Sequence, residues 1–194
     1  MEIKEILEKL EKGNDNFMND NLSHKNEGAA RRAELVDGQA PFAIILGCAD
    51  SRVVPELAFD TGLGELFVAR VAGNVANIST IASIEYAVAV LKTKVIVVMG
   101  HESCGAVGSA IKGDNLGFNL NILLSHITPA IVAAGEGASV NDVVKKNARL
   151  TAIDLANRSE ILAQAVKDED LKIVPAYYHL ATGKVEFLKE EELS

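Results

Sequence analysis

The two cysteines of this chain each lie in a short motif that also contains another type of metal-binding side chain. The first motif, Gly47–Arg52, reads GCADSR, and the second, Gly100–Gly105, reads GHESCG. Two thiolates, one imidazole and one carboxylate form a ligand set that suits zinc. Each motif follows a run of β-branched and apolar residues. We therefore expect two neighbouring strands to deliver these ligands to one edge of a sheet.

Two cysteines on their own have several uses. They can form a disulfide, remain as buried thiols in the core, or bind a metal. The acidic and imidazole side chains of Asp50 and His101 stand close to Cys48 and Cys104 in the sequence. This proximity favours metal binding over the other two uses.

The predicted site depends on where each ligand stands along its strand. Cys48 follows the first predicted strand and His101 ends the third, so adjacent strands would bring both to one metal ion. Cys104 lies three residues beyond His101 at the start of a predicted helix, where the helix dipole favours a thiolate. We expect three nearby glycines to allow tight turns around the ion: Gly47, Gly100 and Gly105.

Three protein ligands leave the fourth position of a tetrahedral zinc site undecided. Asp50 can fill that position and close the site, or it can pair with Arg52 and leave the site open for water or substrate. A closed site would be structural. The chain has enough apolar residues to fold without a metal staple, which favours the catalytic alternative.

The surrounding elements alternate between apolar strands and helical patterns. Strands are predicted at 42–46, 65–71, 94–99 and 171–178, with an antiparallel edge strand at 184–188. Helices are predicted at 2–20 (with a possible break near Gly13-Asn14), 26–37, 78–91, 105–112, 119–134 and 140–167. This order predicts an α/β fold with a mainly parallel central sheet of about four strands, an antiparallel edge strand, helices on both faces and an N-terminal helical extension.

The chain is predicted to form one domain over residues 1–194, with an N-terminal helical arm at 1–38 and an α/β core at 39–194. The first helix is amphipathic, yet later helices are expected to cover the sheet already. It can lie across a neighbouring subunit, which predicts a homo-oligomer, or pack on its own domain.

Composition excludes some classes of function. The net charge of −8 argues against a nucleic-acid-binding protein, which needs a basic surface. No apolar run reaches the roughly 20 residues that span a membrane, so no membrane partner is expected. The charged N-terminus lacks the apolar core of a signal peptide, which predicts a cytoplasmic protein.

The two motifs, in this order, resemble the paired signatures of the β-class carbonic anhydrases, and the resemblance runs from about Gln39 to the last strand. It implies that Cys48, His101 and Cys104 hold Zn2+ and that Asp50 either binds the zinc or pairs with Arg52. It also implies homodimers or homotetramers with the active site at the dimer interface. The substrate pocket of the plant-like subgroup is matched by Gln39, Phe67 and Tyr86. Each of these three residues also has an ordinary structural alternative, in a loop, a core strand and a helix respectively.

The activity that this resemblance implies is the reversible hydration of carbon dioxide to bicarbonate and a proton by zinc-bound hydroxide. Gln39 would donate a hydrogen bond to the developing carboxylate, and the Asp50–Arg52 pair would act as a gate. Because two thiolates neutralise the dication, we expect activity to rise toward alkaline pH. Two alternatives remain open: another small linear substrate, such as carbon disulfide, carbonyl sulfide or cyanate, and a structural zinc module.

Overall fold

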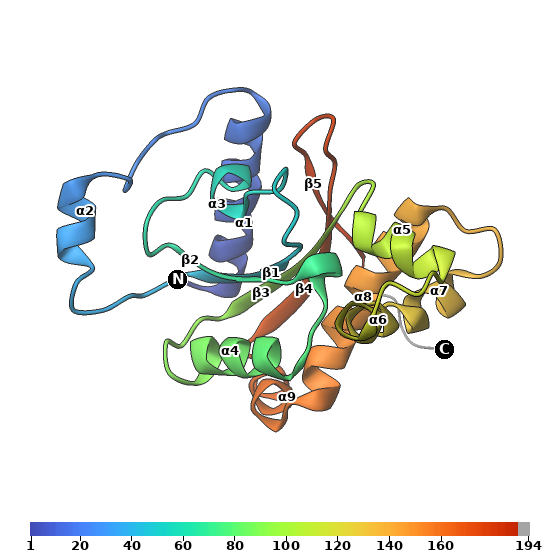
Figure 1. Cartoon of the computed structure of the whole chain (residues 1–194). Helices are drawn as coiled ribbons and strands as arrows, with labels where there is room; N and C mark the ends of the chain where they lie inside the picture. The colour runs from blue at the N-terminus through green and yellow to red at the C-terminus, as the bar shows by residue number, and fades with distance from the viewer. Residues whose placement is uncertain (190–194) are drawn as a thin grey trace.

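A computed structural model of the chain describes residues 1–189. Its centre is one five-stranded sheet with the strand order β2-β1-β3-β4-β5 (Figure 1). The first four strands in that order run parallel, and β5 pairs antiparallel with β4, as predicted. The strands are β1 (Ala43–Gly47), β2 (Leu66–Arg70), β3 (Val95–His101), β4 (Lys172–Tyr178) and β5 (Val185–Phe187).

Helices cover both faces of this sheet, as the fold class predicts, but they are divided unequally (Figure 1). The larger apolar cluster lies between the sheet and α4 (Ile78–Ala89), α5 (Gly105–Lys112), α6 (Phe118–Ser125), α7 (Thr128–Ala134), α8 (Val140–Arg158) and α9 (Glu160–Lys167). The smaller cluster lies on the opposite face, against α1 (Ile3–Met18) and α3 (Pro55–Ala58). Successive β1 residues pack alternately into the larger and the smaller cluster. This is why the whole strand is buried and apolar.

The first helix packs on its own sheet, so the expectation that it lacks a place there is wrong. Ile6 and Leu10 of α1 are almost fully buried in the smaller cluster. The later helices gather on the other face, and α1 covers the one that they leave open. The possible break near Gly13 is also absent, because α1 is continuous there. A Cβ on Gly13 would lie 2.0 Å from the carbonyl oxygen of Phe59, so this glycine permits close packing.

Other differences from the sequence expectation concern element boundaries. The pattern at 119–134 forms two helices, α6 and α7, and the pattern at 140–167 forms α8 and α9. Ser159 separates the latter pair, and its side chain accepts a hydrogen bond from the backbone N–H of Leu162. The second helix, α2 (Ala29–Glu34), is shorter than expected, and the 3-10 turn η1 (Ala72–Asn74) was not predicted.

The strand β2 lies at the edge of the sheet, so its first four residues are half-buried and Arg70 is exposed, where the sequence pattern suggested a buried strand. Within residues 1–189, no helix combines the length and the apolar character that crossing a membrane requires.

Candidate metal centre

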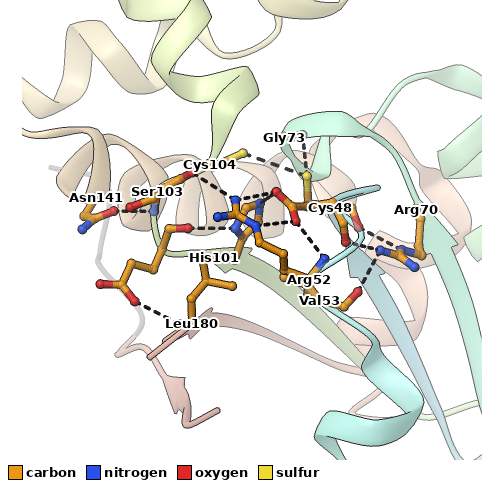
Figure 2. Close-up of polar contacts among 12 residues, drawn as sticks. Cys48, Arg52, Val53, Arg70, Gly73, His101, Ser103, Cys104, Asn141 and Leu180 are labelled. Atoms are coloured by element: carbon orange, nitrogen blue, oxygen red, sulfur yellow. Dashed lines mark hydrogen bonds and ion pairs between the residues drawn. The ribbon is translucent and has the colours of Figure 1, made fainter. Parts of the chain in front are cut away.

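Three side chains with metal-binding atoms meet at the carboxyl edge of the sheet, as the predicted strand ends imply (Figure 2). Cys48 directly follows β1, His101 ends the adjacent strand β3, and Cys104 is the N-cap of α5. Their ligand atoms lie within 4.8 Å of one another, and the two Sγ atoms are 4.0 Å apart. All three residues are buried, so the protein encloses a compact set of two sulfur atoms and one nitrogen.

The imidazole of His101 is oriented for ligation. The carbonyl oxygen of Glu102 lies 2.9 Å from Nδ1, so Nδ1 carries the proton and donates it in a hydrogen bond. Nε2 is buried and has no hydrogen-bond partner among residues 1–189. A buried nitrogen without a partner is costly unless something binds it. A metal ion among these three donors satisfies that nitrogen, and tetrahedral zinc suits two sulfurs and one imidazole.

The two thiols differ in their surroundings. The Cys104 thiol, His101 and the backbone N–H of Gly73, which lies 3.3 Å from Sγ, lower the pKa of Cys48 to about 4 against the effect of burial. The contact with Cys48, together with burial, raises the pKa of Cys104. The two Sγ atoms, 4.0 Å apart, are close enough to bind one divalent cation, which requires both thiols to lose their protons.

Asp50 pairs with Arg52 beside this cluster. The guanidinium donates from Nε to Oδ1 at 2.9 Å and from a terminal nitrogen to Oδ2 at 2.7 Å. This two-point contact lowers the pKa of the Asp50 carboxyl below its ordinary range. Oδ2 also lies 3.8 Å from Nε2 of His101. Of the two alternatives for Asp50, the structure thus shows pairing with Arg52. Zinc ligation by Asp50 stays a prediction.

Arg70 supports the loop that carries Cys48 and Asp50, a role that the sequence pattern did not reveal. Its guanidinium donates to the backbone carbonyls of Cys48, Asp50 and Val53 at 2.9, 2.6 and 2.8 Å (Figure 2). These bonds cross from the end of β2 to the loop after β1. They hold the backbone that places both the first thiol and the carboxylate.

The glycines of the two motifs do not serve the predicted purpose. Gly47, Gly100 and Gly105 have no positive φ, whereas Ser103 adopts the left-handed region with φ 52°. A Cβ on Gly100 would lie 2.6 Å from Cγ1 of Val144, so this glycine lets α8 approach β3. A Cβ on Gly105 would meet nothing within 4 Å.

The three predicted pocket residues lie apart from the metal centre within one chain. Gln39 is exposed and precedes β1, whereas Cys48 follows it, so they stand at opposite ends of that strand. Phe67 pairs with Ile44 in the middle of β2 and packs into the larger cluster. Tyr86 is 49% exposed in the second half of α4. Among the described residues, no hydrogen bond or ion pair joins these three to the metal centre.

Comparison with known proteins places this arrangement in a family. Residues 43–185 match the family model described as carbonic anhydrase. A carbonic anhydrase of Mycolicibacterium smegmatis is 38% identical over 183 residues, which cover 91% of this chain and 89% of the relative. Carbonic anhydrase 2 of Mycobacterium tuberculosis is 37% identical over 181 residues, covering 90% of this chain and 87% of the relative.

Solved structures give the same result. A tetrameric β-carbonic anhydrase from the ascomycete Sordaria macrospora superposes with a TM-score of 0.74 at 27% identity, covering 81% of this chain and 85% of the other. The β-carbonic anhydrase CcaA also has a TM-score of 0.74, at 26% identity, and covers 95% of this chain and 94% of the other. With its fold, its Cys-His-Cys cluster and these relatives, the chain belongs to the β-class carbonic anhydrase family.

Proposed function

We propose that this chain is a zinc enzyme that catalyses the reversible hydration of carbon dioxide to bicarbonate and a proton. The observation that carries this proposal is the unpartnered, buried Nε2 of His101, which faces the Sγ atoms of Cys48 and Cys104. Zn2+ held by these three side chains would lower the pKa of a water molecule and so supply a nucleophile near neutral pH.

The residues around the metal centre have separate tasks in this proposal. Arg52 holds the Asp50 carboxylate in a fixed position 3.8 Å from Nε2 of His101. From there Asp50 can accept a hydrogen bond from the nucleophile and orient it toward the carbon atom of carbon dioxide. The pair also keeps Asp50 from closing the fourth ligand position.

The substrate pocket is proposed to require a second copy of the chain. Gln39, Phe67 and Tyr86 bind substrate in this proposal, but one chain leaves Gln39 at the far end of β1 from the metal centre. The half-buried edge strand β2 offers unpaired backbone groups that a second copy can cover. A homodimer or homotetramer is therefore proposed, and the tetrameric relative from Sordaria macrospora supports it. We also propose a cytoplasmic location, where Cys48 and Cys104 would stay reduced.

The test is stopped-flow measurement of carbon dioxide hydration on zinc-loaded and metal-stripped protein at several pH values. We expect rapid hydration that needs zinc, is inhibited by small anions, and rises toward alkaline pH. A protein that binds zinc stoichiometrically but hydrates no carbon dioxide at any pH would reject the proposal. It would then favour either a structural zinc site or another small linear substrate, such as carbonyl sulfide, which the same assay can test.

A further inference from the structure

We propose that Glu102 is a positioning residue for the metal ligand His101, and that it acts by fastening the ligand loop to the hairpin between β4 and β5. The inference rests on the proposed metal site and goes beyond it, because it concerns what fixes the imidazole. Glu102 stands between His101 and Ser103 in the second motif, and its side chain is half-buried.

The backbone of Glu102 contacts the imidazole of His101 directly. The carbonyl oxygen of Glu102 accepts the hydrogen bond from Nδ1 of His101 at 2.9 Å. This bond fixes both the tautomer and the rotation of the ring, and with them the direction of Nε2. Within residues 1–189, it is the one hydrogen bond that the structure gives to the imidazole. The orientation of the ligand atom therefore depends on the orientation of the peptide group after Glu102.

Glu102 is itself anchored to the hairpin between β4 and β5. Its backbone N–H donates to the carbonyl oxygen of Tyr178 at 2.9 Å, which extends the β3–β4 pairing by one residue. Its carboxylate Oε2 accepts from the backbone N–H of Leu180 at 2.9 Å and from that of Ala181 at 3.4 Å (Leu180 is labelled in Figure 2). Hydrogen bonds to a carboxylate are stronger than those between neutral groups. Glu102 is thus tied to the hairpin at its backbone and at its side chain.

The hairpin is in turn held by hydrogen bonds within its turn and by bonds to α1. His179 donates its N–H to the carbonyl of Lys184, and Gly183 donates to the carbonyl of His179. The buried Asn14 of α1 donates to the carbonyl of Gly183 at 2.8 Å and accepts from the N–H of Val185 at 2.8 Å. A hairpin held by its own turn and by a buried side chain has little freedom to follow a moving loop.

The backbone next to Glu102 is strained and needs support. Ser103 holds a left-handed conformation with φ 52°, which a residue other than glycine adopts at a cost. Its N–H donates to Oδ1 of Asn141 at 2.9 Å. The peptide group between Glu102 and Ser103 is thus held by Asn141 at its N–H and by the imidazole at its carbonyl, while the Glu102 carboxylate holds the residue before it. Loss of the carboxylate contact would leave this peptide group to the bonds with Asn141 and Tyr178 and so loosen the orientation of His101.

The test compares four proteins: the wild type, Glu102→Gln, Glu102→Asp and Glu102→Ala. Glutamine keeps the length of the side chain and an oxygen that can accept from Leu180, whereas aspartate keeps the charge and loses the reach. The control is Glu65→Ala, because Glu65 likewise accepts a hydrogen bond from a backbone N–H, that of Gly62 at 2.8 Å, but lies directly before β2. Zn2+ affinity is measured by competition with a chromophoric chelator. Urea unfolding of each metal-free protein reports stability separately.

We expect zinc affinity to fall by about 10- to 100-fold in Glu102→Ala and Glu102→Asp, and to stay within about threefold of the wild type in Glu102→Gln and Glu65→Ala. Equal affinities in all variants would overturn the inference, as would an aspartate variant that matches the wild type while the glutamine variant fails. If Glu102→Ala does not fold, the aspartate and glutamine variants decide the matter. A wild-type chain that binds no zinc would reject the metal site and this inference together. A wild type that binds zinc as tightly as every variant rejects this inference alone.

Discussion

The metal centre and the predicted substrate pocket differ in how much of each one chain completes. Cys48, His101 and Cys104 come from adjacent elements and meet within 4.8 Å in a buried cluster. Gln39 and Tyr86 come from the same chain, yet both are exposed and neither contacts that cluster by a described hydrogen bond or ion pair. The sheet topology brings the ligands together, because adjacent parallel strands end at one edge. It places Gln39 at the opposite end of β1, and we propose that another chain brings the pocket residues to the metal centre.

The largest effect is expected when one of the proposed metal ligands is removed. Cys104→Ser should abolish stoichiometric zinc binding and lower carbon dioxide hydration at least ~10³-fold, because the reaction depends on the metal. Ser51→Ala is the control, since Ser51 is exposed in the first motif and is not a metal-binding residue. Zinc content and stopped-flow rates check both variants. A Cys104→Ser protein that keeps zinc and activity would show that the cluster is not the metal centre.

A smaller effect is expected when the proposed gate, the Asp50–Arg52 pair beside the candidate metal centre, is altered. Arg52→Ala should lower hydration about 10- to 100-fold, because the freed Asp50 can close the fourth ligand position. Arg52→Lys keeps the charge but loses the two-point contact of 2.9 and 2.7 Å, so its activity should lie between those of Arg52→Ala and the wild type. Hydration rates and a crystal structure of the zinc-loaded Arg52→Ala protein check this. Unchanged turnover together with an Asp50 that stays off the zinc would reject the gate.

Packing behind the metal centre gives a prediction about stability. Gly100→Ala places a Cβ 2.6 Å from Cγ1 of Val144 and 3.3 Å from its carbonyl oxygen, so the Val144 side chain or α8 itself must shift. We expect the free energy of unfolding to fall by about 1–3 kcal/mol. Gly105→Ala flanks the same motif with no atom within 4 Å of the added Cβ and should change little. Urea unfolding of the two metal-free variants measures the difference, and equal losses of stability would contradict the packing argument.

The smallest effect is expected from pH. The pKa of Asp50 is lowered in the folded state by Arg52. Its ion pair therefore stabilises the fold above the ordinary carboxyl pKa of about 3.9, and that stabilisation is lost as the pH falls toward the folded-state value. The stability difference between the wild type and Asp50→Asn should be constant between about pH 5 and 7 and shrink below about pH 4. Urea unfolding of metal-free protein across this range measures it. A difference that grows on acidification would contradict the lowered pKa.

Much of the fold could be predicted because its strands are apolar and most of them are separated by helical patterns. The sequence could not show that the later helices gather on one face and leave the other to α1, since crossover lengths do not state which face a helix takes. Gly13 looked like a helix breaker, and its real role depends on Phe59, which is distant in the chain. Ser159 divides a long helical pattern through a local cap that hydrophobic periodicity does not detect.

The metal cluster could be predicted for a related reason. Its members stand next to strand ends, so local sequence and topology together place them. The supports of the cluster were missed, because Arg70 and Glu102 act through backbone atoms of segments far away in the sequence. The sequence around a charged residue does not indicate which distant backbone carbonyl or N–H its side chain will bind.

The most direct test of this contrast is subunit complementation. Cys104→Ser lacks a metal ligand, and a Gln39→Ala, Tyr86→Ala double variant lacks part of the pocket. Mixed dimers of the two contain one site with both an intact metal centre and an intact pocket only if these come from different chains. Random mixing should then restore about a quarter of wild-type hydration, since half of the dimers are mixed and half of their sites are intact. A mixture that is no more active than the average of the two variants alone would contradict the account and place the whole site within one chain.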